Sequence, residues 1–226
     1  MAAIDGASTE GRDSHRADTR TELVRAAEVL FAENGIDGAS LREINRTAGA
    51  ANAGAVQYHF GDRAGLLRAV VDKHRTDTEI RRHALLDQFD ATRSTDVRDL
   101  SAALILPLAS KLDDPDGGRA YLRINCEICT RPDFDAITEV LPKRGSSSSM
   151  RRWHERFDPL ASTDERERLH TRFPAMRFAF VELARRATGP ARRDDRLFVS
   201  HLIDLVTVLL TAEPSPPTRA VMPRGR

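Results

Sequence analysis

The chain has 226 residues, of which 40% are hydrophobic and 31% charged, and its 35 Lys and Arg residues nearly balance 34 Asp and Glu residues. This composition excludes a disordered chain and a uniformly basic nucleic-acid coat protein, and it allows one large globular domain or two small ones. The least polar stretch, residues 205–212, is far shorter than the roughly 20 apolar residues that cross a bilayer, so we predict no membrane span.

The two ends of the chain differ from its middle in composition. Residues 1–18 hold almost no large apolar side chain and no signal-peptide hydrophobic region, and residues 214–226 are rich in proline. We therefore expect flexible tails at both ends and a cytoplasmic protein. Between the tails, apolar residues recur at helical spacing with almost no alternation of period two, which predicts an all-α fold.

The first predicted helix starts at Thr19, where Thr19 and Glu22 have the spacing of a capping box, and it ends at residues 34–35, Asn-Gly. Its apolar face recurs at i, i+3 and i+4. A second capping box, formed by Ser40 and Glu43, predicts a helix of about two turns that ends at Gly49.

A third short helix is predicted over residues 52–59, before Gly61 breaks it and Asp62 caps a longer helix. Two short helices joined by a glycine-containing turn and preceded by a longer helix are typical of a helix-turn-helix, whose second helix enters the major groove of DNA. Asn52 and Gln57 carry amides that can pair with base edges, while Tyr58 and His59 can donate to phosphates. The candidate DNA-contacting residues are Ser40, Arg42, Asn52, Ala53, Gln57, Tyr58, His59 and Arg63.

Three segments resemble the N-terminal domain of the tetracycline-repressor (TetR) family: TRTELVRAAEVLFAENG from residue 19, SLREI from residue 40 and NAGAVQYHFGDRAGLL from residue 52. The resemblance implies a ligand-responsive dimeric transcription factor, usually a repressor, and the same candidate DNA contacts. The chain departs from the family pattern at Arg63, where Lys is frequent, and at Ala55, where Thr or Ser is common. We expect a DNA-binding domain over residues 19–64 and a helical effector-binding and dimerisation domain over residues 65–213.

Near the C-terminus, two predicted helices joined at residues 189–190, Gly-Pro, each carry an apolar seam with alternating steps of four and three. Two such hairpins could form a four-helix bundle in a homodimer, although the seams could also pack within one chain. Pro174 predicts a kink or a helix start within the first seam, which begins near Leu169. The candidate interface residues are Phe173, Met176, Phe180, Leu183, Phe198, Leu202, Leu205 and Leu209.

The family resemblance also implies an effector pocket among the middle helices. Apolar and aromatic residues in that region would favour a small, mainly apolar effector, although such residues are more often plain core than ligand contacts. The candidate pocket residues are Leu104, Leu108, Tyr121, Ile124, Met150 and Trp153, and Phe134 and Phe157 are further aromatic residues of the same region.

Cys126 and Cys129 share one face of a predicted helix, where they could be packed core or a thiol or metal sensor. We find no catalytic spacing, phosphate-binding loop or paired zinc-binding histidine motif, so we predict no enzyme, no cofactor and no metal site. The leading hypothesis is a homodimeric repressor released from a palindromic double-stranded operator by its effector. The alternatives are a helical small-molecule-binding protein without DNA binding and a sensor that uses the two cysteines.

Overall fold

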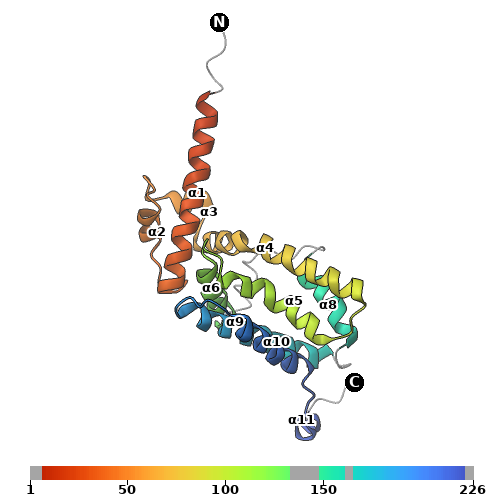
Figure 1. Cartoon of the computed structure of the whole chain (residues 1–226). Helices are drawn as coiled ribbons and strands as arrows, with labels where there is room; N and C mark the ends of the chain where they lie inside the picture. Colours follow the sequence, from red (N-terminus) through yellow and green to blue (C-terminus); the bar gives the residue numbers. More distant parts are fainter. Residues whose placement is uncertain (1–6, 133–147, 161–164, 222–226) are drawn as a thin grey trace. The chain divides into compact units, whose positions relative to one another are not determined.

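The computed structural model describes residues 7–132, 148–160 and 165–221, and helices are the regular secondary structure of these residues (Figure 1). This confirms the predicted all-α fold. The chain divides into two compact units, and the helices α4 (Arg63–Thr92) and α9 (Glu165–Thr188) contribute residues to both. None of the described helices combines the length and the apolar character that a bilayer crossing requires.

The first unit holds α1 (Ala7–Asn34), α2 (Leu41–Thr47), α3 (Ala55–Phe60), the first half of α4, the short 3-10 helix η1 (Ser110–Leu112), α6 (Gly118–Thr130) and the end of α9. Helix α1 packs on both α2 and α6. Apolar residues at helical spacing supply the core of the unit, as the sequence pattern predicts. Its fully buried members include Leu23, Ala27, Ile44, Leu66, Val70, Leu122 and Ile124.

Helix α1 starts at Ala7, twelve residues before the predicted start at Thr19. Thr19 lies inside the helix, and Glu22 forms an ion pair with Arg25 at 2.7 Å instead of capping a helix end. The capping-box prediction was therefore wrong. Its spacing also suits a helix interior, because residues three apart lie on one helix face and can pair there.

The second unit holds the rest of α4, α5 (Val97–Ala109), α8 (Ser149–Phe157), the 3-10 helix η2 (Asp158–Leu160), most of α9, α10 (Arg196–Thr211) and α11 (Pro216–Val221). Helix α5 packs on α10 and on α8. Trp153 of α8 is buried, donates its indole N–H to the Leu100 carbonyl at 2.8 Å and stacks on Phe157. The interior of this unit is therefore mainly apolar, and the polar side chains buried in it include Arg82, Ser101 and Ser149.

Three predictions for the C-terminal half need comment. Helix α9 runs through Pro174, so it does not start there, and the alternative of a kink at Pro174 stays a prediction. Residues 189–195 separate α9 from α10, as the Gly-Pro signal indicates. Helix α11 lies in the predicted C-terminal tail and begins at Pro216, where the missing N–H of proline costs no helical hydrogen bond. Phe134 and the Leu169 side chain lie outside the described residues.

Candidate nucleic-acid interface

Helix α3 is shorter than the predicted recognition helix. It begins at Ala55, because Asn52 accepts a hydrogen bond from the Gly54 N–H at 2.8 Å through its side chain and forms a turn before the helix. Asn52 and Ala53 therefore lie in the connection between α2 and α3. Gly49, with φ +63°, takes the left-handed backbone that ends α2.

The buried side chain of Asn45, on α2, joins this connection to α3. Its Nδ2 donates to the Ala53 carbonyl at 2.7 Å, and its Oδ1 accepts from the Val56 N–H at 3.2 Å. The side-chain amide of Asn45 thus pairs with a backbone carbonyl of the turn and with a backbone N–H in the first turn of α3. The sequence prediction missed this residue, although its place beside Ile44 on a short amphipathic helix was a usable signal.

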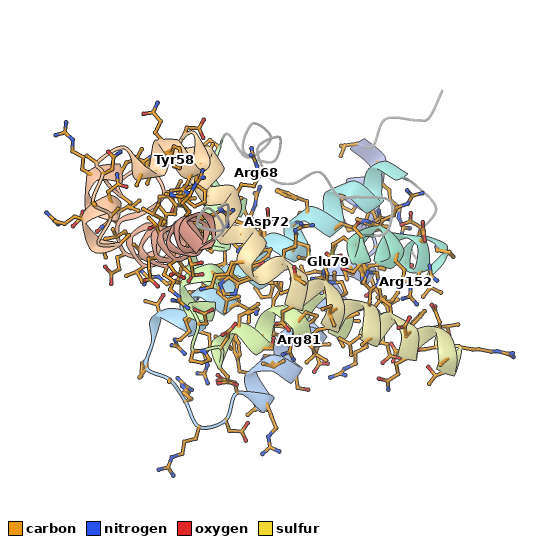
Figure 2. All side chains as sticks on the ribbon, turned by 90° about the horizontal axis from the view of Figure 1, so that it is seen from above. Tyr58, Arg68, Asp72, Glu79, Arg81 and Arg152 are labelled. Atoms are coloured by element: carbon orange, nitrogen blue, oxygen red, sulfur yellow. The ribbon has the colours of Figure 1, made fainter. Side chains whose placement is uncertain are left out.

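The sides of α3 separate as a DNA-reading helix requires. Ala55 and Val56 are buried, whereas Gln57 is exposed and Tyr58 has 64% of its surface open to solvent (Figure 2). His59 is half-buried. The other predicted contacts Ser40, Arg42, Asn52 and Ala53 are also exposed.

Ser40 and Arg63 have structural positions that the sequence indicated only in part. Ser40 is the N-cap residue of α2, but its side chain makes no capping hydrogen bond, and Glu43 pairs with Arg46 at 3.2 Å. Arg63 Nη1 donates to the carbonyls of Ile36 and Ala39 at 2.6 Å each. Arg63 therefore fixes the loop between α1 and α2, a role that leaves less of its guanidinium for DNA than predicted.

Two arginines of α1 stack on aromatic rings of α3. The Arg16 guanidinium lies 5.2 Å from the Tyr58 ring centre and donates to the Tyr58 hydroxyl, and the Arg20 guanidinium lies 5.0 Å from the Phe60 ring centre. Burial lowers the pKa of His59, and the charges of Arg16 and Arg20 lower it further. These effects favour the neutral imidazole of His59, which can both donate and accept a hydrogen bond.

Helix α6 contacts the end of α1 and the loop that follows it. The Glu127 carboxylate accepts the Ile36 N–H at 2.9 and 3.1 Å, and Arg131 pairs with Asp37 at 2.6 Å. Further along, buried Glu28 of α1 binds His74 and Lys73 of α4. The predicted DNA-binding helices are thus held by polar contacts to helices that follow them in the chain.

The predicted pocket residues are all buried, and they divide between the two units. Leu104, Leu108, Met150 and Trp153 belong to the second unit, and Tyr121 and Ile124 to the first. Their assignment to an effector site stays a prediction.

The predicted interface residues differ in exposure. Leu183 and Leu202 are buried within the chain, Leu205 is exposed, and Phe173, Met176, Phe180, Phe198 and Leu209 are half-buried. Leu197 and Val208 of α10, which the seam pattern did not include, are 84% and 63% exposed.

Cys126 and Cys129 are both half-buried thiols. Burial raises the pKa of Cys126, and the neighbouring Glu127 carboxylate raises it further. A reactive thiol needs the opposite shift, so the environment of Cys126 favours packing over redox chemistry. Within the part of the chain that the structure describes, no three His, Cys, Asp or Glu side chains gather as metal ligands would.

Comparison with known proteins agrees with this geometry. Residues 23–70 match the family model of bacterial regulatory proteins of the tetR family. No curated protein sequence matches the chain.

Among solved structures, the chain is similar to NalD of Pseudomonas aeruginosa, the secondary repressor of the MexAB-OprM multidrug efflux pump. The two share 24% identity over 89% of this chain and 99% of NalD, with a TM-score of 0.51. Proteins of Mesorhizobium loti and Rhodococcus sp., both named as TetR-family transcriptional regulators, give 16% and 18% identity over 86% and 84% of this chain and 96% and 99% of theirs, with TM-scores of 0.44 and 0.45. Residues 23–70 therefore carry the sequence of the N-terminal domain of tetR-family bacterial regulatory proteins, and the helical fold is like that of NalD.

Proposed function

We propose that this protein is a homodimeric transcriptional repressor that binds a palindromic DNA operator and leaves it when a small, mainly apolar effector binds. The observation that carries the proposal is the exposed polar side of α3, where Gln57 and Tyr58 project from a helix that Asn45 holds in place. Gln57 can pair with an adenine edge, and the Tyr58 hydroxyl can donate to a phosphate. Residues 52–59 therefore offer side chains for reading base edges and for contacting the phosphates of the DNA backbone.

The exposed apolar side of α10 supports the dimer. Leu197, Leu205 and Val208 are exposed, and at 100° per residue they lie within about 80° of one another around the helix. Half-buried Phe198 and Leu209 extend this side toward the core. A homodimer formed through this side would carry two recognition helices, and a palindromic operator offers them two half-sites about 34 Å apart.

The apolar interior of the second unit supports the effector class. Leu104, Leu108 and Met150 are buried there, and the Trp153 indole already has a hydrogen-bond partner. A ligand that replaced part of this packing would make mainly apolar contacts. Such an effector would release DNA by binding more tightly to the form of the protein that does not fit the operator.

The test is a selection from random duplex DNA with the purified protein at about 100 mM salt, followed by sequencing of the bound pool. We expect an enriched palindrome whose half-sites lie about ten base pairs apart. Gln57→Ala should relax the preference at one position of each half-site, whereas Gln88→Ala, which alters an exposed amide of α4 in the second unit, should not. A folded protein that enriches no sequence would instead favour a helical binding protein without DNA function.

A further inference from the structure

Two arginines of α1, Arg16 and Arg20, bring positive charge to α3. Arg16 and Arg20 are four residues apart, so their side chains lie on one face of α1, one turn from each other. Each guanidinium stacks on a ring of α3: Arg16 on Tyr58 and Arg20 on Phe60. Both arginines are exposed, so solvent, or a ligand, can reach them.

The hydrogen bond between Arg16 and Tyr58 sets the direction of the hydroxyl proton. Arg16 Nη2 donates to the Tyr58 oxygen, so this oxygen acts as the acceptor. The phenol proton then remains available to donate to another oxygen. A phosphate oxygen placed there would accept a hydrogen bond from the uncharged Tyr58 hydroxyl and would lie beside the Arg16 guanidinium. Arginine is the residue type best suited to phosphate recognition.

We propose that Arg16 and Tyr58 together form a phosphate-binding site for duplex DNA, and that Arg20 supplies a second cation one turn along α1. The proposal rests on the DNA-binding function proposed above and extends the interface from α2 and α3 to the first half of α1. Stacking holds both guanidinium groups in place before DNA arrives, so less side-chain entropy is lost when the phosphate binds.

Nearby charges favour an anion at this position. Half-buried His59 lies between Tyr58 and Phe60, and its ring centre is 5.0 Å from that of Tyr58. The two arginines disfavour a third positive charge on His59, which agrees with a local potential that would attract a phosphate.

The experiment measures the affinity of the protein for its selected duplex as a function of salt concentration. Affinity falls as salt rises, and the steepness of this fall on a log–log plot reports the number of phosphate contacts. Each lost phosphate contact should reduce the magnitude of the slope by about 1 per subunit. We expect Arg16→Gln and Arg20→Gln to show this change and to weaken binding about tenfold per site, while the selected sequence stays the same. Arg25→Gln is the matched control, because Arg25 is an exposed arginine of the same helix that pairs with Glu22.

A double-mutant cycle with Tyr58→Phe tests whether the two groups form one site. Tyr58→Phe keeps the ring but removes the hydroxyl, so the loss in the Arg16→Gln, Tyr58→Phe double variant should be smaller than the sum of the single losses. Circular dichroism distinguishes a structural role. If Arg16 only holds the first turns of α1 on α3, Arg16→Gln will lower the helix content and leave the salt slope unchanged.

The outcomes separate this proposal from the one on which it rests. If the wild-type protein selects a duplex and Arg16→Gln behaves like Arg25→Gln, the phosphate site is overturned and the DNA-binding function stands. If the wild-type protein binds no duplex even at low salt, both proposals are overturned.

Discussion

His74 Nε2 lies 2.5 Å from Glu28 Oε1, and each of the two side chains is 3% exposed. Glu28 belongs to α1 and His74 to α4. The other Glu28 oxygen accepts from Lys73 Nζ at 2.7 Å, and His74 Nδ1 lies 3.7 Å from Asp114, in the segment between η1 and α6. The His74 ring also packs on Tyr121 of α6. This buried cluster therefore joins α1, the helix that precedes α2 and α3, to α4 and to the start of α6.

We predict that His74→Ala lowers the free energy of unfolding by about 3 kcal/mol, because it removes one partner of a buried carboxylate. This loss of stability should lie near the lower end of the range for broken buried ion pairs, since Lys73 still contacts Glu28. Arg75→Ala is the control: it removes a pair with Asp72 on the same helix, where Arg75 is half-exposed, and should cost at most about 1 kcal/mol. Urea unfolding measures both, and equal losses would contradict a structural role for the cluster.

Gly117 makes the same cluster sensitive to a single methyl group. Its φ is +84°, and a Cβ on this residue would lie 1.8 Å from Glu28 Oε2. Gly117→Ala should therefore move either the segment before α6 or the Glu28 side chain and cost several kcal/mol, on the order of an overpacked core.

Gly49→Ala is the matched control for Gly117→Ala. Gly49 also has a positive φ, +63°, but no atom lies within 4 Å of its added Cβ. It should cost only the backbone strain, about 1–2 kcal/mol. Glu28→Ala should recover part of the loss in Gly117→Ala, and thermal unfolding of the double variant tests this coupling. Equal destabilisation by the two glycine substitutions would indicate backbone strain alone.

Asn45 connects α2 to the first turn of α3, so its loss should loosen the recognition helix. Asn45→Ala removes the hydrogen bonds to the Ala53 carbonyl and the Val56 N–H, and should cost about 1–3 kcal/mol. Hydrogen exchange is the specific measurement, because the Val56 amide should exchange faster. Thr47→Ala, at the exposed end of the same helix, should leave that amide protected. Unchanged Val56 exchange in Asn45→Ala would show that packing alone positions α3.

Local sequence signals predicted much of this arrangement because they act over a few residues. Gly61 ends α3 with φ +80°, and Asp62 accepts the Gly65 N–H at 2.7 Å at the start of α4, both as expected. The exposure of Gln57 and Tyr58 also followed from the helical period. Their contacts with DNA remain predictions.

The polar contacts between distant segments could not be predicted in the same way. Glu28 falls at i+4 from Val24 and His74 at i+4 from Val70, so each stands on an apolar face of its helix. A titratable residue in such a position indicates a buried partner, but the period does not identify which one. The position of Arg16 on α1 was missed for another reason: the weak apolar pattern before Thr19 suggested a tail, whereas α1 begins at Ala7.

His59 offers a direct measure of the field that Arg16 and Arg20 create. Its pKa lies below the usual 6.5 because of burial and these two charges. Arg16→Gln and Arg20→Gln should therefore each raise the pKa of His59 toward its ordinary value. An NMR titration of the His59 imidazole shifts measures this change. Arg25→Gln should leave that pKa unchanged, and a His59 pKa that no variant moves would place the two guanidinium groups too far away to act on it.

Acid stability should depend on Asp114. Burial would raise the pKa of this carboxyl, but hydrogen bonds from Lys111 and the Asp116 N–H, together with the Lys111 and His74 charges, hold it below its usual value. A carboxylate with a lowered folded-state pKa stabilises the protein above about pH 4 and loses this contribution as the pH falls through the folded-state pKa. Asp114→Asn should therefore flatten the loss of stability below pH 4.

Stability at high pH should depend on Lys111. Burial would lower its pKa, but hydrogen bonds to Asp77 and Asp114 raise it above the usual value. Its stabilisation is therefore complete below about pH 10.5 and is lost as the pH rises through the folded-state pKa, so Asp114→Asn should also weaken the fold at pH 7 to 10. Urea unfolding from pH 2 to 10 measures both the acid limb and the weakening of Asp114→Asn between pH 7 and 10. The exposed neighbour variant Asp113→Asn should keep the wild-type profile, and an Asp114→Asn profile equally steep below pH 4 would assign the acid transition to other carboxylates.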